Sequence, residues 1–165
     1  MANCERSPAL LLASRYSPLA IRPSSKEQQI RLMALPEVAP FNKLLGLTVI
    51  LRSPERTEAQ LTVREELCNR RGVLHGGAVM ALGDTMGAMT ASSSLKPGGR
   101  TATIESKTNF FAPVPQGDTA HAVCTPLHRG RTTLVLETRI NRGDGKLAAI
   151  VTQTQLIFGR DESAP

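Results

Sequence analysis

The stretch NRRGVLHGGAVMALGDT, residues 69–85, decides how the rest of this chain is interpreted. It leads into an apolar segment, residues 75–93, that is rich in Ala, Met and Gly and carries a single carboxylate, Asp84. A helix of this composition is apolar on nearly every side, so we expect it to be buried. The fold is therefore predicted to be built around one central helix.

The segments on either side of this helix have the composition of β-strands. Before it, a short turn of helix at residues 41–45 leads to Gly46, and residues 47–63 hold two β-rich runs that the polar turn SPER joins into a hairpin. After it, the breaker KPGGR precedes four consecutive strand-like segments joined by short turns. They are residues 101–114, 118–130, 131–145 and 146–158. Pro113 and Pro115 lack backbone donors, so the first of the four should end or bulge there.

This order of elements predicts an α+β fold in which an antiparallel sheet wraps a single buried helix. The length of 165 residues fits one domain. We expect that domain in residues 37–160, after a tail and a short amphipathic helix in residues 1–36. Ser24 and Glu27 form the S-x-x-E capping pattern that opens this helix, which runs to about Leu35.

The composition excludes several classes of function. The formal charge of +6 is spread along the chain and aromatic residues make up 3% of it, so platforms for stacking nucleic-acid bases are scarce. Cys4, Cys68 and Cys124 lie far apart with no CxxC pair, which argues against a zinc site and a disulfide framework. No apolar run reaches the roughly 18 residues that a membrane span needs. The first 26 residues loosely resemble a targeting peptide, but their apolar core is short, so we expect a disordered tail on a cytoplasmic protein.

Two glycines mark the point where the loop becomes the central helix. Glycine lets a ligand approach backbone N–H groups that have no helical partner, and the helix N-terminus adds a partial positive charge. Gly76 and Gly77 are therefore candidates for an oxyanion site, which stabilises the charge that develops on a carbonyl oxygen.

Asp84 interrupts the apolar helix, and burial of a carboxylate costs several kcal/mol unless the charge is paired. The functional interpretation is a general base for water, or a nucleophile that attacks a carbonyl carbon. The alternative is a carboxylate that faces solvent, or that a neighbouring Asn or Ser caps, on a partly exposed helix. Asp84 lies about 12 Å along the helix axis from Gly76 and about 80° around it, so one chain cannot easily bring both to one carbonyl. A homodimer, in which the glycines of one subunit face Asp84 of the other, solves this problem.

Asn69 and His75 are interpreted as the polar surroundings of the site. Asn69 has an amide that can hold the attacking water or the carbonyl, and His75 can fix the loop or donate through its imidazole. A histidine that only caps the helix through the backbone is an equal alternative for His75.

The segment resembles the motif of hotdog-fold thioesterases of the phenylacetate-degradation type. In that motif an Asn precedes His-Gly-Gly and an acidic residue follows on the central helix; here Asn69 stands six residues before His75 and Asp84 nine after it. The resemblance covers about residues 37–158. It implies a hotdog fold and hydrolysis of acyl-CoA thioesters to a carboxylic acid and coenzyme A, with no cofactor or metal, in a homodimer that assembles to a homotetramer.

The resemblance also implies roles for residues outside the motif. A Ser or Thr on the strand after the helix assists the carboxylate in related enzymes, and Thr103 is its counterpart, although an ordinary strand threonine is the alternative. Basic and polar residues of the HRGRTT turn would contact the nucleotide of coenzyme A, unless this is simply a solvated basic turn. These are His128, Arg129, Arg131 and Thr132.

The acyl group is expected beside the central helix, against methionines or phenylalanines. The residues considered are Met80, Met86, Met89, Phe110 and Phe111, and each is equally an ordinary core residue. Two other functions remain open: a hotdog dehydratase or hydratase that acts on acyl thioesters, and a non-catalytic module that binds acyl-CoA.

Overall fold

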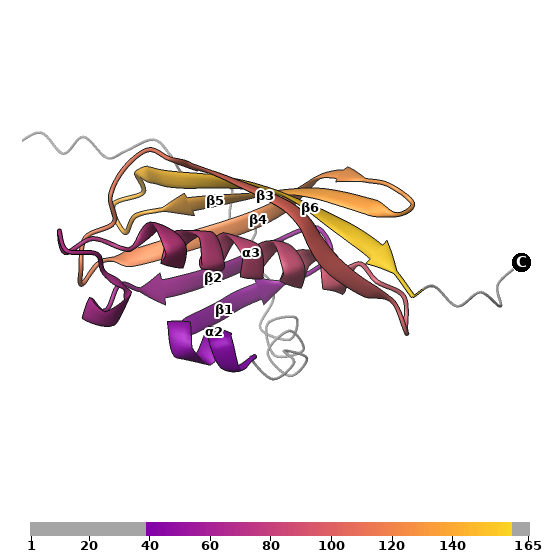
Figure 1. Cartoon of the computed structure of the whole chain (residues 1–165), viewed down its shortest axis with the longest axis horizontal. Coiled ribbons are helices and arrows are strands. Elements are labelled where there is room, and N and C mark those ends of the chain that lie inside the picture. The colour runs from indigo at the N-terminus through magenta and orange to yellow at the C-terminus, as the bar shows by residue number, and fades with distance from the viewer. Residues whose placement is uncertain (1–38, 160–165) are drawn as a thin grey trace, which may run out of the picture. The chain divides into compact units, whose positions relative to one another are not determined.

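The computed structural model describes residues 39–159 (Figure 1). The described elements are, in chain order, α2 (Pro40–Leu45), β1 (Leu47–Arg52), β2 (Thr57–Thr62), the 3-10 turn η1 (Glu65–Leu67), α3 (Gly76–Ser93), β3 (Arg100–Phe110), β4 (Thr119–Arg129), β5 (Thr133–Asn141) and β6 (Leu147–Phe158). The helices and strands predicted within this range are all present, and only η1 was not foreseen. The helix expected to open at Ser24 and the stretch that resembles a targeting peptide lie outside the described residues.

The six strands form one sheet in the order β1-β2-β4-β5-β6-β3, and all neighbours are antiparallel. Helix α3 packs along one face of this sheet and contacts all six strands, most extensively β4 and β6 (Figure 1). The prediction of an α+β hotdog fold, a sheet around one central helix, is confirmed.

The hydrophobic core lies between α3 and the sheet. Alternate residues of the strands face it, as in the buried series Ala120, Ala122 and Cys124 of β4. On the helix, Leu82 and Met86 are fully buried against them. The alternation of buried and half-buried residues along β4 therefore marks the inner face of that strand.

Helix α3 departs from the prediction that it is buried on all sides. Met80 is 47% exposed and Asp84 is also exposed, whereas Leu82 has no exposed surface. The physical reason is that one sheet has one inner face, so within a single chain it covers one side of the helix. The side that carries Met80 and Asp84 remains uncovered in the described part of the chain.

Strand β3 forms an edge of the sheet and contains a bulge. It ends at Phe110, before Pro113 is reached, and its pairing with β6 shifts register between Thr103 and Glu105, where Ile104 is the extra residue. Thr103 pairs with Gln155 and Phe110 pairs with Ala149, and both of these β6 residues face the core. The bulge therefore places Thr103 and Phe110 on the same face of the sheet, the face toward α3.

Candidate functional site

The N-terminus of α3 is capped by a side chain that the sequence motif supplies. His75 is the N-cap residue, and its Nδ1 accepts a hydrogen bond of 2.9 Å from the backbone N–H of Gly77. Ala78 and Val79 donate to the carbonyl of His75. Gly76 is the first residue of the helix, where a backbone N–H has no helical acceptor. Of the two glycines, Gly76 is thus the better candidate for an oxyanion donor, because the N–H of Gly77 is already paired.

Asn69 lies in a loop whose own hydrogen bonds hold it in place. Its Oδ1 accepts from the backbone N–H of Arg71 at 2.9 Å, and its backbone N–H donates to the carbonyl of Val73. The loop is also bonded to the connection between β3 and β4, because Leu74 N–H donates to Val114. With Oδ1 engaged, the amide nitrogen of Asn69 remains as a donor for a ligand.

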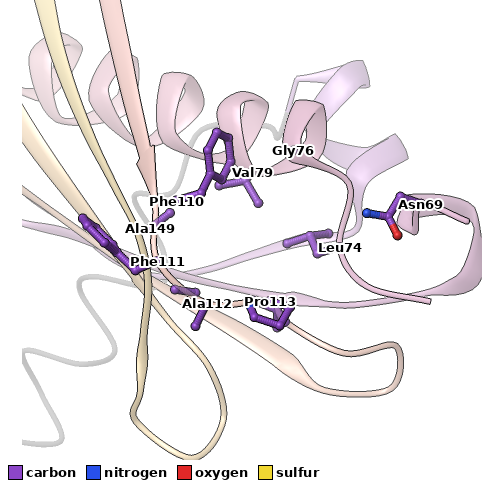
Figure 2. Close-up of a pocket in the computed structure, with 11 residues that line it drawn as sticks. Asn69, Leu74, Gly76, Val79, Phe110, Phe111, Ala112, Pro113 and Ala149 are labelled. Carbon is purple, nitrogen blue, oxygen red and sulfur yellow. The ribbon is translucent and has the colours of Figure 1, made fainter. Parts of the chain in front are cut away.

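A cavity of about 350 Å³ lies beside these two elements (Figure 2). Asn69 and Gly76 provide its polar edge, and the rest of its lining is apolar. The apolar residues are Leu74, Val79, Phe110, Phe111, Ala112, Pro113, Val114, Ala148 and Ala149. Figure 2 shows Asn69 on the loop that runs into α3, and Phe110 beside the first turns of the helix, across the cavity. A cavity of this kind holds an apolar group next to a few oriented donors, as small-molecule sites do.

The phenylalanines line this cavity and the methionines of α3 do not. Phe110 and Phe111 are 55% and 57% exposed, so both are available to a ligand. Met86 is fully buried in the core, and neither Met80 nor Met89 contributes to the lining. Of the two groups considered from the sequence, the phenylalanines therefore lie at the cavity.

Asp84 lies outside this cavity and is held by side chains of two strands. Its Oδ1 accepts a hydrogen bond of 2.9 Å from Thr103 Oγ1 on β3 and one of 2.8 Å from Gln153 Nε2 on β6. Within the described part of the chain, no residue donates to Oδ2. The carboxylate is thus oriented through one oxygen, with the other available. Asp84 and Gly76 stand in different surroundings, as the helix geometry in the sequence indicated.

Two glutamines of β6 belong to the surroundings of Asp84 but were not among the site residues predicted from the sequence. Gln153 and Gln155 are 1% and 0% exposed, and Gln155 Nε2 donates to Thr103 at 2.7 Å. The sequence does contain a signal for them: in the run AIVTQTQ, alternation places both glutamines on the same face as Ala149 and Val151, which belong to the core. A polar residue at a core position of a strand needs a partner, and here the partners are the groups around Asp84.

The basic turn between β4 and β5 lies at the other end of α3. Arg129 donates to Ser94 Oγ at 2.8 Å and to the carbonyl of Pro54, so it links this turn to the C-terminus of the helix. His128, Arg131 and Thr132 are exposed. Since α3 has 18 residues, the turn and the cavity are separated by about 27 Å along the helix axis.

The pKa values of Cys124 and Arg52 are shifted, but neither residue belongs to the candidate site. Burial raises the pKa of the Cys124 thiol, which lies in the core, and the neutral thiol is a poor nucleophile. Burial also lowers the pKa of Arg52, whose guanidinium donates to Ser92 and Ser93 at the end of α3. In residues 39–159 no three His, Cys, Asp or Glu side chains gather as a metal site would require. Over the same range, no helix is both long and apolar enough to cross a membrane.

Comparison with known proteins identifies the family. The thioesterase superfamily profile matches residues 71–149, which include α3 and the strands β3, β4 and β5. A candidate esterase of Deinococcus radiodurans is 30% identical over 120 residues, which cover 72% of this chain and 80% of the relative. The chain belongs to the thioesterase superfamily.

Solved structures agree with this assignment. A thioesterase of Haemophilus influenzae superposes with a TM-score of 0.69 at 26% identity, over 75% of this chain and 87% of the Haemophilus chain. The PaaI protein of the phenylacetic acid degradation operon of Escherichia coli has a TM-score of 0.70 over 82% of this chain and 96% of its own. At 24% identity, the second similarity concerns the fold alone. The reaction class is thioester hydrolysis, so the groups required are an oxyanion donor and a base or nucleophile.

Proposed function

We propose that this thioesterase hydrolyses acyl-CoA thioesters to a carboxylic acid and coenzyme A. Asp84 either activates the water or attacks the thioester carbon, and the N–H of Gly76 stabilises the oxyanion. Asn69 donates its amide to the carbonyl or to the water. The observation that carries the proposal is the way Asp84 is oriented. Its side chain is exposed on a largely apolar helix, yet Thr103 and Gln153, on the face of the sheet toward α3, both donate to its Oδ1.

The active site is proposed to form between two subunits. Gly76 and Asn69 line the cavity, whereas Asp84 lies further along α3 on its uncovered side. Met80 on that side and Phe110 beside Gly76 are large exposed apolar side chains, and edge strand β3 has backbone groups that no strand of the described chain pairs. A second copy that covers this side would bring its Asp84 to the cavity of the first.

The basic turn fits the same arrangement. Within one chain it lies at the end of α3 opposite the cavity, which is too far for one ligand to reach easily. If two copies of α3 run antiparallel, the turn of one subunit approaches the cavity of the other. Arg131, Thr132 and His128 are then proposed to contact the phosphates of coenzyme A, and Phe110 and Phe111 to contact the acyl group.

The test is a thiol-release assay with acetyl-CoA, benzoyl-CoA and palmitoyl-CoA. We expect release with at least one of these thioesters, and a rate at least about a hundredfold lower in Asp84→Asn, the scale on which an acid–base group contributes. Glu58→Gln removes a carboxylate on β2, outside the site, and should keep the rate of the unmodified protein.

Three results would contradict the proposal. Absence of thiol release with all three thioesters, when the protein binds one of them, would indicate a binding module. Hydration of an enoyl-CoA without thiol release would indicate a hydratase. An Asp84→Asn variant with an unchanged rate would remove the role proposed for the carboxylate.

A further inference from the structure

Gln153 and Gln155 are the largest polar side chains in the core, and both lie on β6 facing α3. Amide side chains are seldom fully buried, because each brings two donors and a carbonyl that need partners. The residues that satisfy these donors are therefore informative about why glutamine stands at both positions.

The hydrogen bonds of the two glutamines lead to one carboxylate oxygen. Gln155 Oε1 accepts from Thr101 Oγ1 at 2.9 Å, and Gln155 Nε2 donates to Thr103 Oγ1 at 2.7 Å. Thr103 in turn donates to Asp84 Oδ1. Gln153 Nε2 donates both to Thr103 Oγ1 at 2.7 Å and directly to Asp84 Oδ1 at 2.8 Å. Gln153 is thus in direct contact with the carboxylate, and Gln155 is one residue removed from it.

The orientation of the Gln153 amide favours Asp84 at the expense of its own carbonyl. Gln153 Oε1 is buried and has no hydrogen-bond partner in the described structure. It lies against α3 at Gly87, where a Cβ atom would be 2.1 Å from it. Rotating the amide by half a turn would exchange Oε1 and Nε2, but it would place a carbonyl oxygen against the carboxylate. An unpaired buried carbonyl lowers stability. The observed orientation of the amide therefore costs stability at Oε1 and provides Asp84 with a donor.

We propose that Gln153 is a positioning residue for the hydrolysis, which rests on the proposed role of Asp84. Its Nε2 fixes Oδ1, so that Oδ2 is left in a constant direction for the water or the thioester carbon. Gly87 is part of the same device, because any side chain at that position would displace the amide. Gln153 itself needs no contact with the substrate.

The experiment compares Gln153→Met with Gln155→Met, using the acyl-CoA that the unmodified protein hydrolyses fastest. The two variants are matched: each removes a fully buried amide from the same face of the same strand. We expect kcat to fall about tenfold or more in Gln153→Met with KM within about twofold, since only orientation of the reacting group is lost. Gln155→Met should lose markedly less. Equal losses of kcat in the two variants, or a loss that appears only in KM, would overturn the proposal.

A double-mutant cycle with Asp84→Asn separates this proposal from the proposed function. If Gln153 acts through Asp84, adding Gln153→Met to Asp84→Asn lowers the residual rate no further. If it lowers that rate by the same factor as before, Gln153 acts independently and the proposal is wrong, while the role of Asp84 stands. If Asp84→Asn alone keeps the full rate, the proposed function fails and the role of Gln153 fails with it.

Thermal unfolding of each variant shows whether a loss of rate reflects a loss of structure. We expect Gln153→Met to melt close to the unmodified protein, because an unpaired buried carbonyl is removed together with the donor. Gln153→Leu, which has a different shape and no polar atom, replaces it in the cycle if Gln153→Met does not fold. The same pattern of kcat, KM and non-additivity is expected from either variant.

Discussion

A carboxylate on an apolar helix acquires its direction from the side chains that donate to it. For Asp84 these come from two strands, Thr103 of β3 and Gln153 of β6, and both reach the same oxygen. The resemblance to hotdog thioesterases pointed to Thr103, because a hydroxyl at that place is part of the family pattern. Gln153 follows from no motif, and only the burial pattern of β6 indicates it.

Thr103→Val tests the hydroxyl while keeping the shape of the side chain. We expect kcat to fall about tenfold, because Asp84 loses a donor, and the free energy of unfolding to drop by about 1–3 kcal/mol, because the amide of Gln155 loses its acceptor. Steady-state kinetics and urea unfolding measure the two effects. Thr103→Ser keeps the hydroxyl and should restore most of both; a serine variant as impaired as the valine variant would contradict this account.

Most residues of this candidate site could be named from the sequence, but their hydrogen bonds could not be predicted. For His75 it left two roles open, and the structure has it as the N-cap of α3. It treated Gly76 and Gly77 alike, whereas the imidazole occupies the N–H of Gly77 alone. The side-chain rotamer of His75 decides which N–H is occupied, and that rotamer depends on packing contacts that a sequence motif does not specify. The catalytic roles themselves stay predictions until the variants are measured.

At the scale of secondary structure, the close approach of α3 to β6 depends on two helical glycines. A Cβ atom at Gly83 would lie 2.5 Å from Val151, and one at Gly87 would meet Gln153. The two glycines are one helical turn apart, so they form one flat side of the helix. This side lets β6 reach the helix closely enough for Gln153 to contact Asp84.

Gly83→Ala should therefore destabilise the protein, although alanine favours a helix by about 1 kcal/mol over glycine. We expect a net loss of about 1–3 kcal/mol in the free energy of unfolding, because the methyl group overpacks the contact with Val151. The matched control is Val151→Ala, which opens space at the same contact. In the double variant the two losses should be less than additive; strict additivity in urea unfolding would show that the contact is not the cause.

Most elements, but not their irregularities, could be predicted from the sequence. Alternation and turn residues predicted the hairpin of β1 and β2 and the four strands after α3, because these signals are local. The two prolines predict that β3 ends or bulges at Pro113, whereas the strand ends three residues earlier, at Phe110. The bulge at Ile104 was not foreseen at all, because it arises from the pairing of β3 with β6, about 50 residues later in the chain.

At the scale of the whole molecule, the proposed site needs two chains. The cavity lies at the N-terminus of α3, where Asn69 and Gly76 line it, whereas Asp84 lies further along the helix. The described chain does not cover the side of the helix that carries Asp84. The sequence predicted this separation from the 3.6-residue period of a helix, which is independent of tertiary detail. The basic turn at the far end of α3 is a second feature that two antiparallel subunits would bring to the cavity.

Mixed dimers test whether the site is shared. Asp84→Asn and Asn69→Ala subunits should each be poorly active alone, but a dimer with one of each has one site that combines an intact Asn69 with an intact Asp84. After equal amounts are unfolded together and refolded, we expect about a quarter of the unmodified activity, since half of the dimers are mixed and each has one working site. Thiol release gives the measurement. Activity equal to the mean of the two separate variants would mean that each site lies within one chain.

If Thr103 and Phe110 act as proposed, the bulge in β3 makes the spacing of this strand, and not only its side chains, a condition for activity. Thr103 and Phe110 are an odd number of residues apart, so regular alternation would send one of them to the outer face of the sheet. The extra residue, Ile104, corrects this parity and gives the hydroxyl beside Asp84 and the ring beside the cavity a common face. Substitutions at Ile104 leave the parity intact, whereas deletion of one residue between Thr103 and Phe110 reverses it. During evolution of this protein, selection would therefore act more strongly against insertions and deletions of single residues in that interval than against substitutions.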